Sequence, residues 1–479
     1  MGLRTASQYL ESLRDDRVVF YRGERVSDVT HHPILGVAAE HTALEYRLAE
    51  EAPFRDLLVV DDPETREPIS RYFHIPRSAE DLYKRSTLIE TTTREGGSVV
   101  LLIKDIGSDA LFALHILAQA VDRAHGTRYF ENVRRYYEKC KREDLALAVA
   151  QTDVKGDRSL RPSQQAHPDY YIRVVRETSE GIVVRGAKAH TTNAVLTNEL
   201  IVLPTRALSE QDRDYAVAFA LPINSPGLKL IASPSGFEGA STFHHPVSAR
   251  HKMIESLTVF DDVLVPWDRV FLKGEWRFAG PLASTFVEFH RFTAISYKSP
   301  LLELLVGSAA LIAEYNGIAR ASHVQDKLAR LCMYAATVKG LTRAAALNCR
   351  LVEGIAVPDP VLTNTAKYFF ARNYHEAVRD VQDIAGGLLV TGPGEEDLQN
   401  PETSSYLHRY LGGKAEVAAE HRLRLMNLIR DLTASNLGGY NEVLAIHAEG
   451  SMEAQKITLL RDMDLAAYKA YACKMAGLP

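Results

Sequence analysis

The chain has 479 residues, of which 46% are hydrophobic and 24% are charged, and its formal net charge is −5. This composition is ordinary for a folded globular protein and argues against a disordered chain, a disulfide-rich scaffold or a nucleic-acid-binding surface. We find no signal-peptide core at the N-terminus and no uninterrupted apolar run of about 18 residues. We therefore expect a cytoplasmic protein with neither a nucleic-acid nor a membrane partner.

The predicted secondary structure changes at about residue 140. Before it, helical segments alternate with loops: Ser78 begins a helix with a capping-box-like start, and residues 109–121 predict a buried helix. After it, short strand-like runs follow one another, with a hairpin signal at residues 177–181. These runs predict a small antiparallel β-domain, either a barrel or a sandwich.

From about residue 276 the sequence is helical again. Long amphipathic stretches occupy residues 301–315, 322–352, 360–384 and 403–432, and such helices with short connections pack as an antiparallel bundle. We predict an α+β protein with three domains: a mainly helical domain (1–140), a central β-domain (141–275) and a C-terminal four-helix bundle (276–479). This order suggests the acyl-CoA dehydrogenase-like architecture.

Several common motifs are missing from the chain. It has no dinucleotide-binding glycine motif, no phosphate-binding loop, no zinc-protease motif and no nucleophile elbow. Four cysteines lie far apart, and we interpret them as reduced thiols: Cys140, Cys332, Cys349 and Cys473. No metal site is expected.

A polar loop at the start of the β-domain is the first candidate for a cofactor site. A flavin ring needs hydrogen-bonding groups along its pyrimidine edge and a positive group near N1, and a glycine lets the backbone approach a ligand closely. The loop offers all of these, although a solvated turn is the alternative interpretation. Its candidate residues are Gln151, Thr152, Asp153, Lys155, Gly156, Asp157 and Arg158.

Two further segments are candidates for the same cofactor. Thr191 and Thr192 follow a hairpin strand and could contact a flavin ring or ribityl chain, or could instead bond to the local backbone. Gly386 and Gly387 end a long helix. A helix C-cap accounts for one glycine and leaves the second for close approach of a pyrophosphate.

His290, Tyr297 and Lys298 open the predicted bundle and are three groups capable of proton transfer. On a helix, positions 290, 294, 297 and 298 share one face, so we expect His290 on the same side as the other two. We take the three as candidate catalytic residues, with a solvated surface helix as the alternative.

In this order and spacing, these segments resemble the flavoprotein family of 4-hydroxyphenylacetate 3-hydroxylase and 4-hydroxybutyryl-CoA dehydratase, over essentially the whole chain. The strongest marker is TDVKGDRS at 152–159, supported by AKAHTT at 187–192 and GGLLVT at 386–391. The resemblance implies an FAD-binding homotetramer with flavin sites between subunits. The loop at 152–158 and the two threonines would face the flavin ring, and the glycine pair would receive the FAD of a neighbouring subunit. The resemblance also adds four cofactor-binding candidates: Asp383, Ala448, Glu449 and Gly450.

The chain departs from both branches of this family. The dehydratase branch holds an iron–sulfur cluster with three cysteines and one histidine. His290 matches the histidine, but Tyr297 replaces one cysteine, and residues 97–107, where the other two would fall, contain none. Because one thiolate cannot replace three, we predict FAD without an iron–sulfur cluster. The substrate histidine of the hydroxylase branch corresponds to Val149, so neither parent active site is reproduced.

Three functions remain open. We favour a monooxygenase that uses FADH2 from a separate flavin reductase and hydroxylates an aromatic or other electron-rich small molecule, with Lys298, Tyr297 or His290 as the base. The alternative is a cluster-free acyl-CoA dehydrogenase, isomerase or dehydratase-like enzyme. The third is a non-catalytic flavin-binding or assembly subunit.

Overall fold

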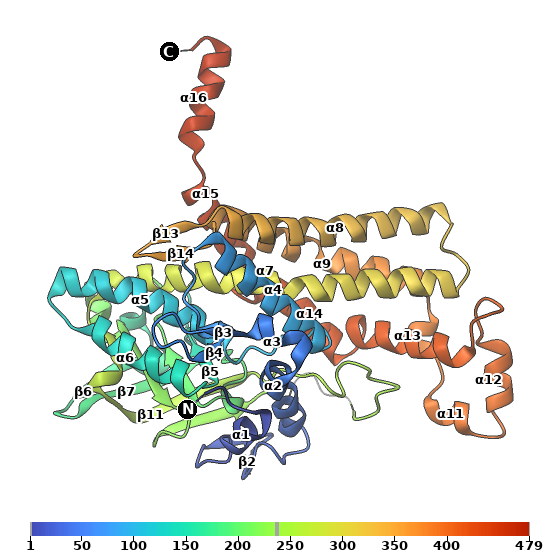
Figure 1. The fold of residues 1–479 in the computed structure, drawn as a ribbon, viewed down its shortest axis with the longest axis horizontal. Coiled ribbons are helices and arrows are strands. Elements are labelled where there is room, and N and C mark those ends of the chain that lie inside the picture. The colour runs from blue at the N-terminus through green and yellow to red at the C-terminus, as the bar shows by residue number, and fades with distance from the viewer. Residues whose placement is uncertain (1, 235–238, 479) are drawn as a thin grey trace.

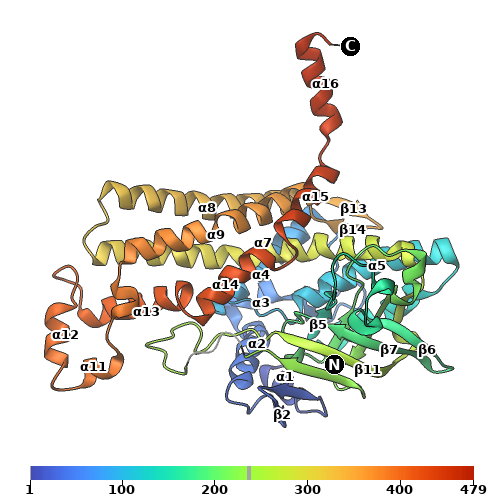
Figure 2. The same cartoon turned by 180° about the vertical axis from the view of Figure 1, so that it is seen from behind.

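The computed structural model of the chain describes residues 2–234 and 239–478. A helical N-terminal region and two β-sheets lie on one side of a set of long helices that run side by side (Figure 1; reverse side in Figure 2). This is the predicted acyl-CoA dehydrogenase-like arrangement of helices, β-domain and helical bundle, and that prediction is confirmed.

The N-terminal region is built around a buried helix. Its helices are α1 (Ala6–Glu11), α2 (Leu35–Glu50), α3 (Ala52–Leu58), α4 (Ala79–Glu95), α5 (Asp105–His125) and α6 (Tyr129–Arg142). Ser78 caps α4 by accepting a hydrogen bond from the backbone N–H of Asp81, as its sequence predicts. Every residue of α5 from 105 to 118 is buried, which confirms the predicted buried helix.

The β-domain consists of two sheets. The larger contains, in spatial order, β2 (Glu24–Val26), β1 (Val19–Tyr21), β10 (Leu228–Ala232), β11 (Ser256–Pro266), β7 (Gly181–Lys188) and β6 (Arg173–Glu177). The smaller contains β12 (Val270–Lys273), β9 (Val217–Pro222), β8 (Glu199–Val202) and β5 (Leu147–Ala150). Their facing side chains share one core, in which the rings of Phe219 and Phe260 pack edge to face.

The sheets decide between the two predicted forms of the domain and differ from the prediction in one respect, the direction of two strand pairs. Among the described residues neither sheet closes on itself, so the domain is the predicted sandwich and not the barrel. The pairs β1–β10 and β5–β8 run parallel. Parallel neighbours require a long crossover: β1 comes from the N-terminal region, and the β6–β7 hairpin separates β5 from β8.

Long helices form the C-terminal region: α7 (Trp276–Tyr315), α8 (Ser322–Leu347), α9 (Pro360–Ala385), α13 (Ala419–Thr433) and α14 (Asn436–His447). The prediction of one helix over 403–432 is wrong, because α12 (Ser404–Tyr410) ends before Gly412 and Gly413. A Cβ on Gly413 would lie 2.1 Å from the carbonyl oxygen of Tyr315, so the chain turns there against the end of α7.

Shorter elements complete the structure. They are the hairpins β3 (Val59–Asp61) with β4 (Pro68–Ser70) and β13 (Arg350–Val352) with β14 (Ile355–Val357), and the helices α10 (Leu388–Thr391), α11 (Glu395–Gln399), α15 (Met452–Asp462) and α16 (Leu465–Ala476). The first residues of the β13–β14 hairpin lie in the stretch predicted as the end of a helix over 322–352. Helix α16 stands away from the body (Figure 1) and has no buried residue.

Helix α7 also corrects an expectation about membranes. By length and composition alone it is apolar enough to cross a bilayer, although the sequence led us to expect no such segment. In the structure 56% of its most apolar window is buried inside the protein, which is the position of a core helix.

Candidate active site

A buried carboxylate connects the two adjacent candidate residues of α7. The Nζ of Lys298 lies 3.1 and 3.2 Å from the two carboxylate oxygens of Glu449, and the hydroxyl of Tyr297 donates to one of them. Glu449 lies in the turn between α14 and α15, with a φ of 54°. Lys367 of α9 approaches the same carboxylate at 3.5 Å. We call these four residues the Glu449 cluster.

Burial and mutual charge shift the proton equilibria of this cluster. Burial lowers the pKa of Lys298 to about 8; the charge of Lys367 also lowers it, while Glu449 opposes the shift. Burial alone would raise the pKa of Glu449, but the charges of Lys298 and Lys367 outweigh it and lower this pKa to about 2. Burial, together with the carboxylate, holds the pKa of Tyr297 well above its ordinary range. A lysine with a pKa near 8 can act as a general base close to neutral pH.

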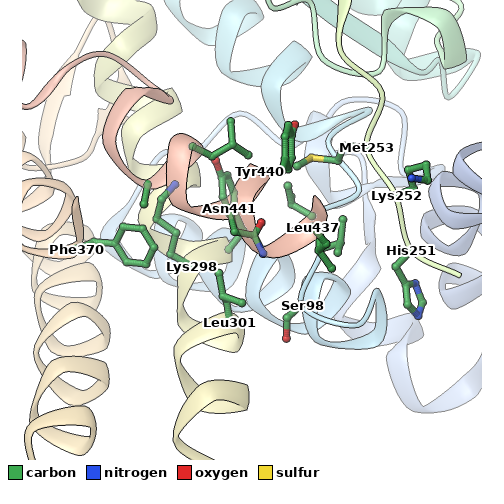
Figure 3. Close-up of a pocket in the computed structure, with 15 residues that line it drawn as sticks. Ser98, His251, Lys252, Met253, Lys298, Leu301, Phe370, Leu437, Tyr440 and Asn441 are labelled. Carbon is green, nitrogen blue, oxygen red and sulfur yellow. The ribbon is translucent and has the colours of Figure 1, made fainter. Parts of the chain in front are cut away.

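Tyr297 and Lys298 line a cavity of about 60 Å³ (Figure 3). Lys298 and Phe370 lie at one end of it, and His251 and Lys252 lie at the other. The walls between them are mainly apolar: Val99, Val100, Met253, Leu301, Leu437, Leu444 and Ala445. Apolar walls with a few placed polar groups are typical of small-molecule sites.

A second, partly buried carboxylate links this cavity to the β-domain. Tyr440 lines the cavity and donates a hydrogen bond of 2.7 Å to Glu255, which also accepts one of 3.0 Å from the hydroxyl of Thr192. Burial raises the pKa of Glu255, although these two hydrogen bonds oppose the shift. Thr192, predicted to touch the cofactor, is therefore one side chain away from the cavity wall.

The neighbouring Thr191 provides a test of whether a flavin fits. Its side chain is fully buried, and its hydroxyl has no hydrogen-bond partner among the described residues. A buried polar atom without a partner is costly and usually signals a bound group or water. It lies three residues beyond β7 and beside Thr192, so its hydroxyl is a polar group that a bound flavin or a water could satisfy.

The polar loop at 151–158 divides into an anchored part and an open part. Asp153 is buried, pairs with Lys188 at 2.9 Å and accepts hydrogen bonds from Thr205 and the backbone of Ile172. In this structure its carboxylate therefore fixes the loop to the sandwich. Lys188 also donates to the carbonyl of Gln151.

Beyond Asp153 the loop turns outward. Gly156 has a φ of 54°, and a Cβ there would lie 2.4 Å from the side chains of Gln165 and Tyr170. Burial and the charge of Arg158 lower the pKa of Lys155. Thr152, Lys155 and Arg158 thus supply the polar and positive groups that a flavin requires, while Asp157 bonds to Ser159 within the loop.

The glycine pair after α9 lies on an open surface. Gly386 has a φ of 83°, and no described atom lies within 4 Å of a Cβ placed on Gly386 or Gly387. Asp383, one turn earlier, pairs with Lys327 at 2.8 Å. In the other cofactor segment, Ala448 caps α14 and Gly450 has a φ of 94° beside the guanidinium of Arg291.

His290 has different partners from Tyr297 and Lys298. Its ring stacks on Phe286, with centroids 5.2 Å apart, and its Nδ1 lies 3.6 Å from a carboxylate oxygen of Asp109. Its side chain is 13% exposed. Its partners thus differ from the Glu449 carboxylate that Tyr297 and Lys298 share.

The cysteines do not form a ligand set. Cys140 is buried in α6, Cys332 is exposed on α8, Cys349 follows α8 and Cys473 lies on α16. Over residues 2–234 and 239–478, no three His, Cys, Asp or Glu side chains come together as a metal site would require. The donor set does not fit an iron–sulfur cluster, and the absence of one remains a prediction.

Two family models together match almost the whole chain. The model described as 4-hydroxyphenylacetate 3-hydroxylase N terminal matches residues 5–272, and the model described as 4-hydroxyphenylacetate 3-hydroxylase C terminal matches residues 279–477. The chain belongs to the 4-hydroxyphenylacetate 3-hydroxylase family. The resemblance drawn from the sequence is confirmed.

Relatives in this family carry two kinds of name. The 4-hydroxybutyryl-CoA dehydratase/vinylacetyl-CoA-Delta-isomerase of Clostridium aminobutyricum is 33% identical, over 99% of this chain and 100% of that one. The oxygenase component of 4-hydroxyphenylacetate 3-monooxygenase from Thermus thermophilus is 32% identical, over 92% of this chain and 90% of that one.

Solved structures show the same division. An archaeal 4-hydroxybutyryl-CoA dehydratase from N. maritimus superposes with a TM-score of 0.93 at 32% identity, covering 100% of this chain and 95% of that one. The oxygenase component of 4-hydroxyphenylacetate 3-monooxygenase complexed with FAD superposes with a TM-score of 0.92 at 29% identity, and the match covers 98% of each chain. The family is therefore certain, and the choice between the two chemistries rests on the site.

Glu255, Lys367, Tyr440 and the cavity wall were not found from the sequence. Lys367 and Tyr440 are single polar residues on α9 and α14, and Glu255 directly precedes β11; no motif surrounds any of them. What distinguishes them is their contacts with distant segments, and these become visible once the helices are packed.

Proposed function

We propose that this protein is the oxygenase component of a two-component flavin monooxygenase. It takes FADH2 from a separate flavin reductase and hydroxylates a phenol or another electron-rich small molecule. The observation that carries this proposal is the pair of the partly buried Tyr297 and the buried Lys298, which line an apolar cavity. The relatives that are named as oxygenase components support it.

The cofactor is FAD, which supplies the activation of molecular oxygen when bound and reduced. We propose that Thr152, Lys155, Gly156, Arg158, Thr191 and Thr192 hold its ring side. The loop at 448–450 would contact it from the bundle. A neighbouring subunit would present Gly386 and Gly387, and we propose a homotetramer with such shared sites, as the resemblance implies. We further propose that it works in the cytoplasm.

Side chains of this protein accept the substrate proton and stabilise the charge that results. A substrate hydroxyl placed at the Lys298 end of the apolar cavity can give its proton to the fraction of Lys298 that is neutral, and this fraction grows as the pH approaches about 8. The ammonium that forms is stabilised by Glu449 at 3.1 Å. Tyr297 donates to the same carboxylate and keeps it oriented. General base catalysis of this kind contributes about 10²–10⁴ in rate.

Turnover should depend on pH through Lys298. A base must be neutral to accept a proton, so kcat/KM should rise with pH and level off once the pH passes about 8. Lys298→Arg, whose side chain keeps its charge, should be slow at every pH and lose this rising limb. A wild-type profile that is flat across this range would contradict the assignment of Lys298 as the base.

The glycine pair gives a second prediction. Gly387→Arg should abolish FAD retention, because its side chain would fill the open space proposed for the cofactor of another subunit. Gly387 has a φ of −62°, which arginine adopts without strain, so the variant should fold. Gly340→Arg is the matched control, because no described atom lies within 4 Å of its Cβ either. Equal FAD retention by both variants and the parent would show that Gly387 only ends a helix and does not contact FAD.

Iron analysis tests the cofactor assignment. Protein purified without oxygen should bind FAD and contain far less than one iron atom per chain. A content of about four irons per chain, as one [4Fe–4S] cluster would give, would contradict it.

A second candidate is double-bond isomerisation or oxidation of an acyl-CoA. The dehydratase/isomerase relative and the archaeal structure favour it, and Lys298 could equally remove a proton from carbon. Supplying FADH2 and oxygen with phenols, and oxidised FAD with CoA thioesters, separates the two. Product from the phenols alone supports the monooxygenase, and product from the thioesters alone supports this second candidate.

A further inference from the structure

Lys367 is a fully buried lysine that does not line the cavity. It lies on α9, one turn before the cavity residue Phe370, and 0% of its side chain is exposed. Its Nζ donates a hydrogen bond of 3.1 Å to the carbonyl of Ala445 in α14 and lies 3.5 Å from Glu449. A buried ammonium is costly unless it is paired. The position is therefore unsuited to binding a ligand directly and needs another explanation.

The charges around Glu449 do not balance. Two ammonium groups, those of Lys298 and Lys367, share one carboxylate, and Arg291 donates to the backbone carbonyl of the same residue at 3.0 Å. The other groups that face Lys298 are the ring of Tyr297 (4.2 Å to its centroid) and the ring of Phe370 (5.3 Å). Other titratable groups near the cluster are His290, Tyr440 and Asp105. The two ammonium groups thus carry one positive charge more than their shared carboxylate neutralises.

We propose that Lys367 is a positioning residue, which holds the Glu449 carboxylate beside Lys298 and places a second positive charge against it. Lys298 already contacts both oxygens of the carboxylate, at 3.1 and 3.2 Å. Lys367 therefore acts on Lys298 through its charge, which lies against the same carboxylate at 3.5 Å and repels the Lys298 ammonium. Without Lys367 this repulsion would be lost, and the amine would hold its proton more tightly. The inference rests on the role proposed for Lys298 in turnover.

The test measures Lys298 without requiring turnover. Cyanate carbamylates only neutral amines, so the rate at which Lys298 is modified, followed by peptide mass spectrometry across pH, reports its protonation in the FAD-loaded protein. The parent should show a midpoint near 8. Lys367→Met should raise it by roughly 1–3 pH units, the size of effect expected from one nearby charge, and shift the pH profile of turnover the same way.

Two variants serve as controls. Lys367→Arg keeps the charge and should stay near the parent midpoint. Lys339→Met removes a lysine that bridges Glu90 and Glu303 elsewhere in the bundle and should leave the Lys298 midpoint unchanged. If Lys367→Met leaves the midpoint within about 0.3 units of the parent, well below the effect of one nearby charge, the inference is overturned. If Lys367→Met does not fold, a parent midpoint near the ordinary lysine value of 10.5 overturns it equally.

These outcomes separate this inference from the proposed function. A shifted midpoint in a protein that hydroxylates no phenol would retain the role of Lys367 and reject the monooxygenase. An unshifted midpoint in an active monooxygenase would reject the role of Lys367 and retain the proposed function.

Discussion

Lys298→Met is expected to lower coupled hydroxylation by about 10²–10⁴-fold, the contribution of a well-placed general base. The substitution removes the amine at the cavity end, while Glu449 keeps Lys367 as a partner at 3.5 Å. FAD binding should therefore be unchanged. Oxygen should still be consumed in the presence of reduced FAD, and hydrogen peroxide should replace the hydroxylated product. The measurement is the ratio of product to oxygen consumed.

Substitutions at two other candidate residues are expected to have smaller or different effects than Lys298→Met. Tyr297→Phe should cost less, because it removes one hydrogen bond to Glu449 and leaves the amine in place. His290→Ala should slow turnover without loss of FAD. Full coupled turnover in all three variants would place the chemistry elsewhere in the protein.

Glu449→Gln is expected to lower the free energy of unfolding by about 3–5 kcal/mol, because it leaves two buried ammonium groups without their carboxylate. Turnover should fall with it. Denaturant unfolding measures the loss, and Glu453→Gln is the control, because that glutamate forms an exposed pair with Lys456 and should change stability by less than about 1 kcal/mol. Equal stability of the two variants would mean that the cluster contributes nothing to folding.

The same carboxylate predicts a dependence of stability on acid. Its pKa is about 2 in the folded protein and 4.5 ordinarily, so the unfolded state binds its proton first. The stabilisation is complete above pH 4.5 and is lost as the pH falls through about 2. The Glu449→Gln variant should lack this contribution.

Local patterns in the sequence predicted the parts of the fold that local physics decides. The hairpin signal at 177–181 corresponds to the β6–β7 turn, and the apolar run at 109–121 is the buried centre of α5. The long stretch at 403–432 failed because Gly413 turns against Tyr315. That contact joins segments far apart in the chain, and no periodicity records it.

In the candidate site, too, the sequence identified individual residues but not the contacts between distant segments. Tyr297 and Lys298 were selected as proton-transfer groups, but their shared partner lies 151 residues beyond Lys298. Glu449 itself was selected only as a cofactor contact, from the resemblance. Its connection to the two lysines depends on how α7, α9 and the α14–α15 turn pack together, which the residues of any one segment do not reveal.

The most direct test of the central claim is a structure of the protein with FAD and a turned-over phenol bound. The account predicts that the phenol ring fills the apolar cavity, with its oxygen about 2.6–3.2 Å from Lys298 Nζ or the Tyr297 hydroxyl, and that the flavin lies beside Thr191 and Thr192. A phenol whose oxygen lies away from both side chains, or a flavin remote from those threonines, would contradict it.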